Sequence, residues 1–513
     1  MKREKHFWFV MLLWLIEVLL IPVLSEGFDD KAHIALSGRA TELSTLDSFL
    51  RTNLGFEFPN GRNETVANGK TVTELVRDGA FDEDRPILWR PRHHFHNPRL
   101  AWDQAGWRPP PFSVQLGESS VIWSQDENQV VGGKHSWKDA RDTYFQALTA
   151  TSDSERKRLY AETFKSLGHL IHLVQDAAVP SHTRNDTHLN YKGIGNPDSF
   201  HGWSESGLAL SMIAGANPPP FNTSLLNQST ANPNAPVPIA RIIDSTDGDI
   251  GTLGLTPGIS MGISEYSSAN FFSDETVNSS DFLSPRSSQV EVHPPESDAT
   301  GTKLRRYIYF RPGFGEQNYP LALASAMLPY VIDPLATRAE NGFDAKVLQG
   351  YGTKLFPRAV GYSAGLIDYF FRGQIEWTDP DNLGLPSATC DPVDRICVKV
   401  RNISLEDTTG SGQLTAFVLC CSSSDGTMTI DLNLVSSPIN VSLTGDFQEV
   451  VFTLTSVPPP LQGADSWNGS LFLVYKGPLG QEQGVVMTGG PCGNYNEVSF
   501  YPQFNYSFFG CNR

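Results

Sequence analysis

Five side chains that can bind a metal ion lie within 34 residues of this sequence. His172 and Asp176 are four residues apart, and His201 and Glu205 repeat that spacing. Residues four apart in an α-helix lie one turn apart on one face, so each pair can present an imidazole nitrogen and a carboxylate oxygen to one ion. His182 lies between the two pairs. One pair is weak evidence, because a single helical histidine is more often structural, but two pairs with a histidine between them predict a metal centre.

Further residues of metal-binding type lie upstream of these pairs. Taken alone, the histidines among them could be ordinary surface residues, and the carboxylates could mark the start of a helix. Together they add candidates to a chain that already needs ligands. His169, three residues before His172, is interpreted as structural. The upstream candidates are His33, His93, His94, His96, Asp82, Glu83 and Asp84.

The spacing of apolar residues predicts most of the helices that must position these side chains. Segment 155–178 is the clearest, and it ends before Pro180, which cannot continue a helix. Ser136 can cap a helix that begins at Trp137. The tryptophan-rich segment 84–125 lacks periodicity and is expected to be an ordered loop. Helical pattern also occurs at 30–54, 201–214, 259–272, 320–340 and 353–372, and 215–258 is predicted to be a long surface loop.

The character of the sequence changes near residue 376. Apolar and polar residues then alternate, with turn residues about every ten positions, which is typical of an antiparallel β-sandwich. All six cysteines lie in this part and predict disulfides, and the absence of a CxxC pair argues against a zinc ribbon. The N-terminal part has no cysteine, so its metal ligands must be nitrogen and oxygen. We expect a mainly α N-terminal domain at 28–375, followed by an all-β sandwich-like C-terminal domain at 385–513.

Residues 1–27 are predicted to be a secretory signal peptide. Basic residues precede a long apolar stretch, and cleavage after Ser25 or after Gly27 is acceptable. An uncleaved membrane anchor is the alternative. We expect a secreted, extracellular protein, with the periplasm or the cell surface as other destinations. Nine Asn-x-Ser/Thr sequons would make it a glycoprotein in a host that glycosylates.

The central motif resembles that of the zinc-dependent bacterial phospholipases C and, more distantly, that of the single-strand-specific zinc nucleases of fungi and plants. Their signature, His-x3-Asp-x5-His followed by His-x3-Glu, stands here with both internal spacings kept. The segment 94–98, His-Phe-His-Asn-Pro, looks like their His-Phe-aromatic-Asp-Pro, and His33 looks like their N-terminal helix ligand. The resemblance covers roughly residues 28–275 and, more weakly, extends to 375. It implies an all-helical fold with three zinc ions in a cleft.

The resemblance also implies how the ligands are divided among three Zn²⁺ ions. Asp176 would bridge the first and third ions. Cleavage after Gly27 would make Phe28 the terminal residue, whose amine and carbonyl would bind the third ion, although the family residue is usually Trp. Either Asp84 or Asp82 fits as the upstream ligand; we favour Asp84, and the remaining carboxylate could act as a catalytic base. The implied sets are His94, His172, Asp176 and the upstream Asp for the first ion, His182, His201 and Glu205 for the second, and His33, Asp176 and Phe28 for the third.

These residues predict a phosphoric diester hydrolase that uses a zinc-activated water. A phospholipase C-like activity is favoured by the motif spacing and the second domain, and exposed aromatic residues in 84–125 would suit a peripheral membrane contact. Those tryptophans could instead simply pack the loop. A single-strand nuclease or 3'-nucleotidase is the alternative, favoured by the spacing from Phe28 to His33. A zinc-stabilised exported binding protein without catalysis is the third. The formal charge of −17 argues weakly against non-specific binding to nucleic acid or anionic membrane, and the sequence does not indicate an oligomeric state.

Overall fold

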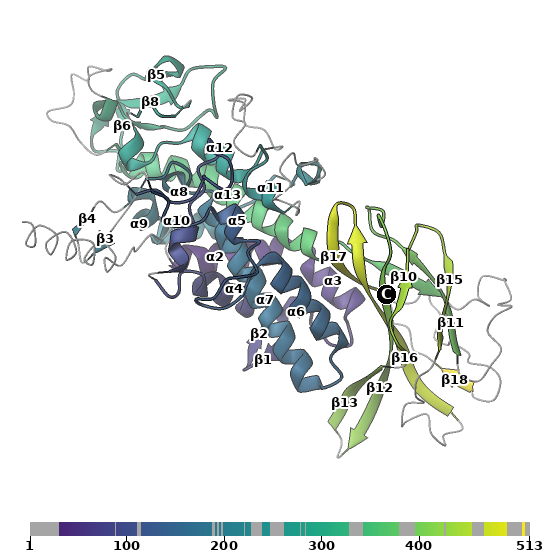
Figure 1. Ribbon diagram of the computed structural model, residues 1–513. Coiled ribbons are helices and arrows are strands. Elements are labelled where there is room, and N and C mark those ends of the chain that lie inside the picture. The colour runs from purple at the N-terminus through teal and green to yellow at the C-terminus, as the bar shows by residue number, and fades with distance from the viewer. Residues whose placement is uncertain are drawn as a thin grey trace, which may run out of the picture.

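The computed structural model describes residues 30–489, with gaps, and residues 505–507 (Figure 1). The predicted signal peptide, Phe28 and much of the predicted loop 215–258 lie outside the described residues, as do Cys390, Cys492 and Cys511. The gaps are residues 88, 110–113, 187–189, 192–193, 196–197, 220, 227–238, 247–260, 278, 283, 328–341, 379–394, 425–426, 435 and 454–465.

Helices dominate the chain up to residue 370, as the sequence predicts. The clearest predicted helix is present with its ends displaced by two residues, and Ser136 caps the helix that begins at Trp137 by accepting a hydrogen bond from the amide of Asp139. The helices are α2 (Asp30–Leu43), α3 (Leu46–Asn53), α4 (Val72–Asp82), α5 (Ser120–Trp123), α6 (Trp137–Thr149), α7 (Asp153–Asp176), α8 (Pro180–Thr183), α9 (Ser199–Ser204), α10 (Gly207–Ala214), α11 (Ala240–Ile243), α12 (Ile263–Asn270) and α13 (Ala345–Phe370).

One predicted helical segment is wrong where the structure describes it. Residues 322–323 form strand β9 (Ala322–Leu323), and a single 3₁₀ turn follows at 324–327. β9 pairs with β8 (Tyr307–Phe310), which in turn pairs with β5 (Val290–Val292). Apolar residues at helical spacing and apolar residues in a short buried strand look alike over so few positions. Pairs of short antiparallel strands, each of two or three residues, complete this part of the chain. They are β1 (Thr65–Ala67) with β2 (Lys70–Thr71), β3 (Asn190–Tyr191) with β4 (Ile194–Gly195), and β6 (Glu296–Ser297) with β7 (Leu304–Arg305).

Helix α7 crosses α4 at very short range because both helices carry glycine at the crossing. A Cβ atom on Gly79 would lie 1.9 Å from the carbonyl oxygen of Lys165, and one on Gly168 would lie 2.2 Å from that of Val76. Any larger residue would therefore push the helices apart. The close crossing brings the last turn of α4 beside the C-terminal half of α7, where His172 and Asp176 lie.

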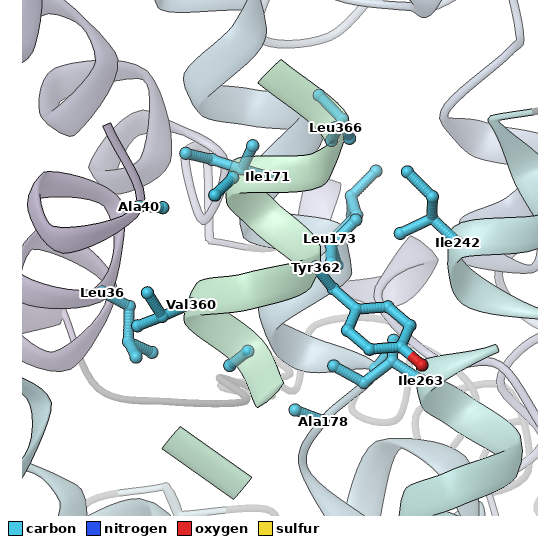
Figure 2. Packing of buried hydrophobic residues seen from close by; sticks show 14 of the residues in the cluster. Leu36, Ala40, Ile171, Leu173, Ala178, Ile242, Ile263, Val360, Tyr362 and Leu366 are labelled. Carbon is cyan, nitrogen blue, oxygen red and sulfur yellow. The ribbon is translucent and has the colours of Figure 1, made fainter. Parts of the chain in front are cut away.

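Helix α13 passes through the middle of the helical core. Figure 2 shows Val360 and Leu366 of α13 among apolar side chains from four other helices. Leu36 of α2 and Ile171 of α7 lie on one side of it, and these helices carry the predicted ligands His33 and His172. Burial of this apolar surface holds in place the helices that position the metal centre.

The C-terminal part consists of two β-sheets around a shared core. One sheet has the order β10-β11-β15, and the other has the order β13-β12-β16-β17, with β14 beside β12 and β18 beside β16. Trp377 and Val398 of the first sheet and Leu473 and Met487 of the second belong to one buried cluster. This arrangement confirms the predicted sandwich-like fold. The strands are β10 (Ile375–Thr378), β11 (Arg395–Asn402), β12 (Gly412–Ser424), β13 (Thr427–Leu434), β14 (Ile439–Val441), β15 (Gln448–Thr453), β16 (Ser466–Leu479), β17 (Glu482–Gly489) and β18 (Asn505–Ser507).

The sheets pack directly against the helices. Phe417, Phe472, Val474 and Val486 of the second sheet belong to the same hydrophobic cluster as the helical core. Cys397 on β11 is disulfide-bonded, and the pairing of the other cysteines stays a prediction. Within the described part of the chain, no helix is both long and apolar enough to span a membrane.

Candidate metal centre

Six buried side chains from separate parts of the helical region meet at Asp176. One oxygen of its carboxylate, Oδ1, lies 3.2 Å from Nε2 of His33 on α2. The other, Oδ2, lies 2.8 Å from Nδ1 of His94, 3.1 Å from Nε2 of His172 and 3.6 Å from Nδ1 of His182. All five residues are fully buried. The sixth member is Asp84, just after α4, whose Oδ1 lies 3.5 Å from Nδ1 of His94 and 3.7 Å from Nε2 of His172.

Hydrogen bonds to other atoms fix the orientation of two of these imidazoles. His172 donates from Nδ1 to the carbonyl oxygen of Ala80, 2.6 Å away, which the close crossing of α4 and α7 makes possible. His33 donates from Nδ1 to Oε1 of Gln175 at 2.7 Å, and Gln175 Nε2 in turn donates to Ser37 Oγ at 3.0 Å. In both rings the proton is on Nδ1, so the lone pair on Nε2 faces Asp176. A carbonyl or amide on the far nitrogen is how metal-binding histidines are usually held.

The donor set fits a cation. Neither oxygen of Asp176 accepts a well-directed hydrogen bond from the residues described, although four ring nitrogens surround the carboxylate. A buried carboxylate without a donor is costly unless positive charge compensates it. Two groups, His33 with Asp84 and His172, and His94 with His172 and Asp176, each bring three ligand atoms within 4.8 Å of one another. Nitrogen and carboxylate ligands of this kind suit zinc.

Electrostatics favour the same interpretation. Burial lowers the pKa of His172 to about 4, which keeps its imidazole neutral and able to bind a metal. Burial also lowers the pKa of His94, but the carboxylates of Asp176, Glu83 and Asp84 outweigh it and raise the pKa to about 10. Burial raises the pKa of Asp176, and the surrounding histidines together more than offset this and hold it well below its usual range. The centre therefore holds ionised carboxylates that attract a cation, and binding would displace the proton on His94.

The three consecutive carboxylates at 82–84 have separate surroundings. Asp84 faces the ligand nitrogens, as described above. Glu83 is buried and accepts hydrogen bonds from the guanidinium of Arg90, from Nε1 of Trp123 at 3.0 Å and from Nδ1 of His169 at 2.5 Å. Its Oε1 also lies 3.7 Å from Nε2 of His94. Asp82 lies near the surface, 3.7 Å from the ammonium of Lys165. The structure thus brings Asp84, and not Asp82, to the cluster, and among the residues described His169 is linked to it through Glu83.

The second predicted pair is less closely associated with the cluster. His201 is half-buried on α9, the helix that Asp198 caps by accepting from the amide of His201. Glu205 accepts a hydrogen bond at 3.0 Å from Nζ of Lys31, which lies in the first turn of α2, two residues before His33. Among the residues described, neither side chain belongs to a group of three ligand atoms within 4.8 Å. Phe28 lies outside the described residues.

No family model and no curated protein matches this chain. Solved structures that match include alpha-toxin of Clostridium perfringens, isolated from avian strain SWCP, at 11% identity, 91% of this chain, 97% of that chain and a TM-score of 0.26. The alpha toxin from Clostridium absonum matches at 11% identity, with the same coverage and a TM-score of 0.30. Likenesses this remote do not decide what the chain does, so its function must be argued from its own residues.

A buried network of hydrogen bonds, which the sequence did not reveal, holds the backbone next to His94 against that of His182. His96 donates from Nε2 to Oδ2 of Asp244 at 2.9 Å and accepts at Nδ1 from Ser119 Oγ at 2.7 Å. Nε1 of Trp102 donates to the same oxygen of Asp244 at 2.8 Å. The amide of His96 donates to the carbonyl oxygen of His182 at 3.0 Å. The one available signal was that His96 stands where the resembling family has an aromatic residue; Asp244 is 148 residues away and gave none.

The His96→Ala variant is expected to bind zinc about 10- to 100-fold more weakly, which is the usual effect of removing a group that orients ligands. The backbone of residue 96 stays, but the ring that anchors it to Asp244 is lost, so the spacing between His94 and His182 loosens. Zinc affinity can be measured by competition with a chromophoric chelator. His93→Ala is the matched control, because the ring of His93 stacks on Trp123 and accepts a hydrogen bond from the amide of Glu118, whereas the ring of His96 donates to Asp244. A variant with lowered thermal stability but unchanged zinc affinity would mean that His96 only packs the core.

Proposed function

We propose that this chain is an exported zinc-dependent phosphodiester hydrolase whose substrates are phospholipids. The observation that carries the proposal is the environment of Asp176, where one carboxylate oxygen faces His33 and the other faces His94, His172 and His182. A carboxylate with imidazoles on both sides is suited to bridge two neighbouring cations. Paired metal ions are a recurring device for cleaving phosphate esters.

Three ions are proposed, as the resemblance implies. The lone pairs on the ring nitrogens, the ionised Asp176 and the nearby Asp84 support the first and third sites. The second site rests on the motif spacing and on the contact of Glu205 with the first turn of α2. The proposed ligands are His94, His172, Asp176 and Asp84 for the first ion, His182, His201 and Glu205 for the second, and His33, Asp176 and the main chain of Phe28 for the third.

Zinc, when bound, lowers the pKa of a coordinated water towards neutrality and offsets negative charge on phosphoryl oxygens. The chain itself contributes by holding the nitrogen ligands in the protonation state and orientation that metal binding needs. Burial keeps His172 neutral, and Ala80 and Gln175 fix the rings of His172 and His33 so that neither must turn when an ion enters. Asp84 is the carboxylate suited to act as a further ligand or to accept a proton at Oδ1. The position of Asp82 beside Lys165 does not favour it for that role.

Phospholipid is favoured over nucleic acid as the substrate. The net charge of −17 would repel a polyanion such as nucleic acid or a strongly anionic membrane over a long distance, so it leaves a zwitterionic headgroup such as phosphocholine as the favoured phosphodiester. The appended β-sandwich and the spacing of the central motif support the same choice, because some phospholipases of the resembling family combine a helical domain with a sandwich.

A chelator experiment tests this proposal. The purified protein is expected to hydrolyse p-nitrophenylphosphorylcholine, to lose the activity after dialysis against EDTA, and to regain it when zinc is restored. Single-stranded DNA, assayed in parallel, is expected to be cut poorly or not at all. Chelator-sensitive cleavage of DNA alone would replace the phospholipase proposal with the nuclease. Zinc binding without hydrolysis of either substrate would leave a zinc-stabilised binding protein.

A further inference from the structure

The three ligands proposed for the second ion lie on two short helices. His182 is on α8, which has four residues, and His201 is on α9, which has six. Glu205 follows directly as the residue that ends α9. Helices of this length are not stable by themselves, so contacts with the rest of the protein must fix their positions. The distance between α8 and α9 therefore decides whether these three side chains can bind one cation.

One turn contacts the segments that carry both parts of this ligand set. It comprises residues 272–276, shortly after α12, and we call it the linking turn. On the side of α9, the carboxylate of Asp274 accepts one hydrogen bond on each of its oxygens from Ser199, the first residue of that helix. The amide of Ser199 donates at 2.6 Å and its hydroxyl donates at 3.0 Å. These two contacts hold the first turn of α9, which also contains His201.

The linking turn also contacts the chain just after His182. Nε of Arg184 donates to Oγ1 of Thr276 at 2.7 Å, and the amide of Glu275 donates to Oδ2 of Asp186 at 2.9 Å. Arg184 and Asp186 are buried, where a lost hydrogen bond is not replaced by one to water. The same short turn is therefore bonded to both segments that carry the ligands.

A buried tyrosine of the helical core fixes the position of the linking turn. The amide of Phe272 donates to the hydroxyl of Tyr351 on α13 at 3.0 Å, and this hydroxyl donates to the carbonyl oxygen of Leu321 at 2.8 Å. Phe272 and Tyr351 are both buried. The turn can thus act as a fixed support for α8 and α9, because its own place is set by a helix that runs through the core.

We infer that Asp274 is a positioning residue for the second ion, because it holds α9, which carries His201, at a set distance from His182. Asp198 also accepts from an amide of α9, but it is the capping residue of that helix and moves with it. Asp274 comes from outside the helix, and both of its oxygens are engaged by Ser199, so it acts through α9. The inference rests on the proposed function for the identity of the second ion and its ligands.

The zinc content of the full chain tests the inference without catalysis. After dialysis at a free zinc concentration that just fills the wild type, the Asp274→Ala variant is expected to hold one zinc ion per chain fewer, as measured by mass spectrometry. The loss is expected to be confined to the second ion, because the groups that orient His172 and His33 stay in place. The affinity for the second ion, measured by competition with a chromophoric chelator, is expected to fall about 10- to 100-fold.

Three further variants make the result specific. Asp274→Asn keeps one oxygen that can accept from the amide of Ser199, so it is expected to regain part of the affinity. Ser199→Ala removes only the hydroxyl and is expected to weaken the second ion less than Asp274→Ala does, with a melting temperature of the metal-free protein close to that of the wild type. Glu275→Ala is the matched control. It removes the neighbouring carboxylate, which is exposed, but keeps the amide that donates to Asp186, and it is expected to bind zinc like the wild type.

Wild-type zinc content and affinity in Asp274→Ala would overturn the inference. The same loss of zinc in Glu275→Ala would also overturn it. So would a loss of all ions from Asp274→Ala together with a lower melting temperature of its metal-free form, since that pattern would indicate a purely structural role. If the wild type binds its zinc but hydrolyses neither p-nitrophenylphosphorylcholine nor DNA, the proposed function fails, and the zinc comparison still decides the role of Asp274. An active wild type beside an Asp274→Ala variant with full zinc would refute this inference alone.

Discussion

The Asp176→Asn variant is expected to lose zinc and to hydrolyse phosphodiesters at least about a thousandfold more slowly. Asparagine keeps the shape of the side chain but removes the negative charge that faces His33 on one side and His94, His172 and His182 on the other. Metal ions supply several kcal/mol of stabilisation to a transition state of this kind, and each 1.36 kcal/mol is a factor of ten in rate. Zinc per chain can be measured by mass spectrometry, and kcat/KM can be measured on p-nitrophenylphosphorylcholine.

Two further variants make this prediction specific. Asp82→Asn is the control, because Asp82 is near the surface beside Lys165, and it is expected to keep its zinc and to react within about twofold of the wild type. Asp84→Asn is expected to lose zinc, since Asp84 lies within 3.7 Å of both His94 and His172. An Asp176→Asn protein with full zinc content and activity would refute the centre. The reverse result for Asp82 and Asp84 would exchange their roles.

Local spacing accounts for the part of the site that was predictable from the residues alone. His172 and Asp176 are on one helix face because they are four residues apart, and the helix itself was predicted to within two residues at each end. No local pattern of residues predicted that His33, Asp84 and His94 would lie beside that helix. That prediction followed from the resemblance of three separated motifs to one family, and the structure brings those residues together.

The supporting atoms could not have been predicted. Gln175 orients His33 across 142 residues, and the group that orients His172 is a backbone carbonyl, that of Ala80, which no residue type reveals. Only the tertiary packing of α4 against α7 creates that contact. The helix predicted at 201–214 is two helices, because Ser206 caps α10 anew by accepting from the amide of Ala209. A helix-capping residue within a helical pattern is easily missed, since serine is also tolerated inside helices.

The contact between the helical part and the β-sheets could not be predicted from the sequence either. Buried charged side chains lie at the centre of this contact. Glu482, at the start of β17, is buried between two arginines of the helical part. Arg141 Nε lies 3.0 Å from its Oε1, and Arg372 Nη1 lies 2.7 Å from its Oε2. Trp137 donates to the same carboxylate at 2.7 Å. Apolar side chains of both parts surround the group. The helical part and the sandwich are therefore joined by a buried, charged contact as well as by apolar packing.

The Glu482→Gln variant is expected to be less stable by about 3–5 kcal/mol, because removing one partner leaves buried charge uncompensated. Burial raises the pKa of Glu482, but the Arg141 and Arg372 guanidiniums outweigh burial and hold that pKa below its ordinary value. Because the folded pKa lies below the unfolded one, the stabilisation is complete above the unfolded pKa and is lost as pH falls through the folded pKa. Differential scanning calorimetry at neutral pH should show an earlier transition for the variant, and the difference from the wild type should shrink in acid.

An exposed ion pair at the same interface provides the comparison that makes this result interpretable. Lys476 contacts Asp142 at 2.7 Å, but both side chains are partly exposed, so Lys476→Gln is expected to cost less than about 1 kcal/mol. If the two variants melted alike, the buried carboxylate would contribute no more than a surface pair. A large loss for Glu482→Gln alone would show that the helical part and the β-sandwich depend on each other for stability. In that case the sandwich has a fixed position relative to the metal centre.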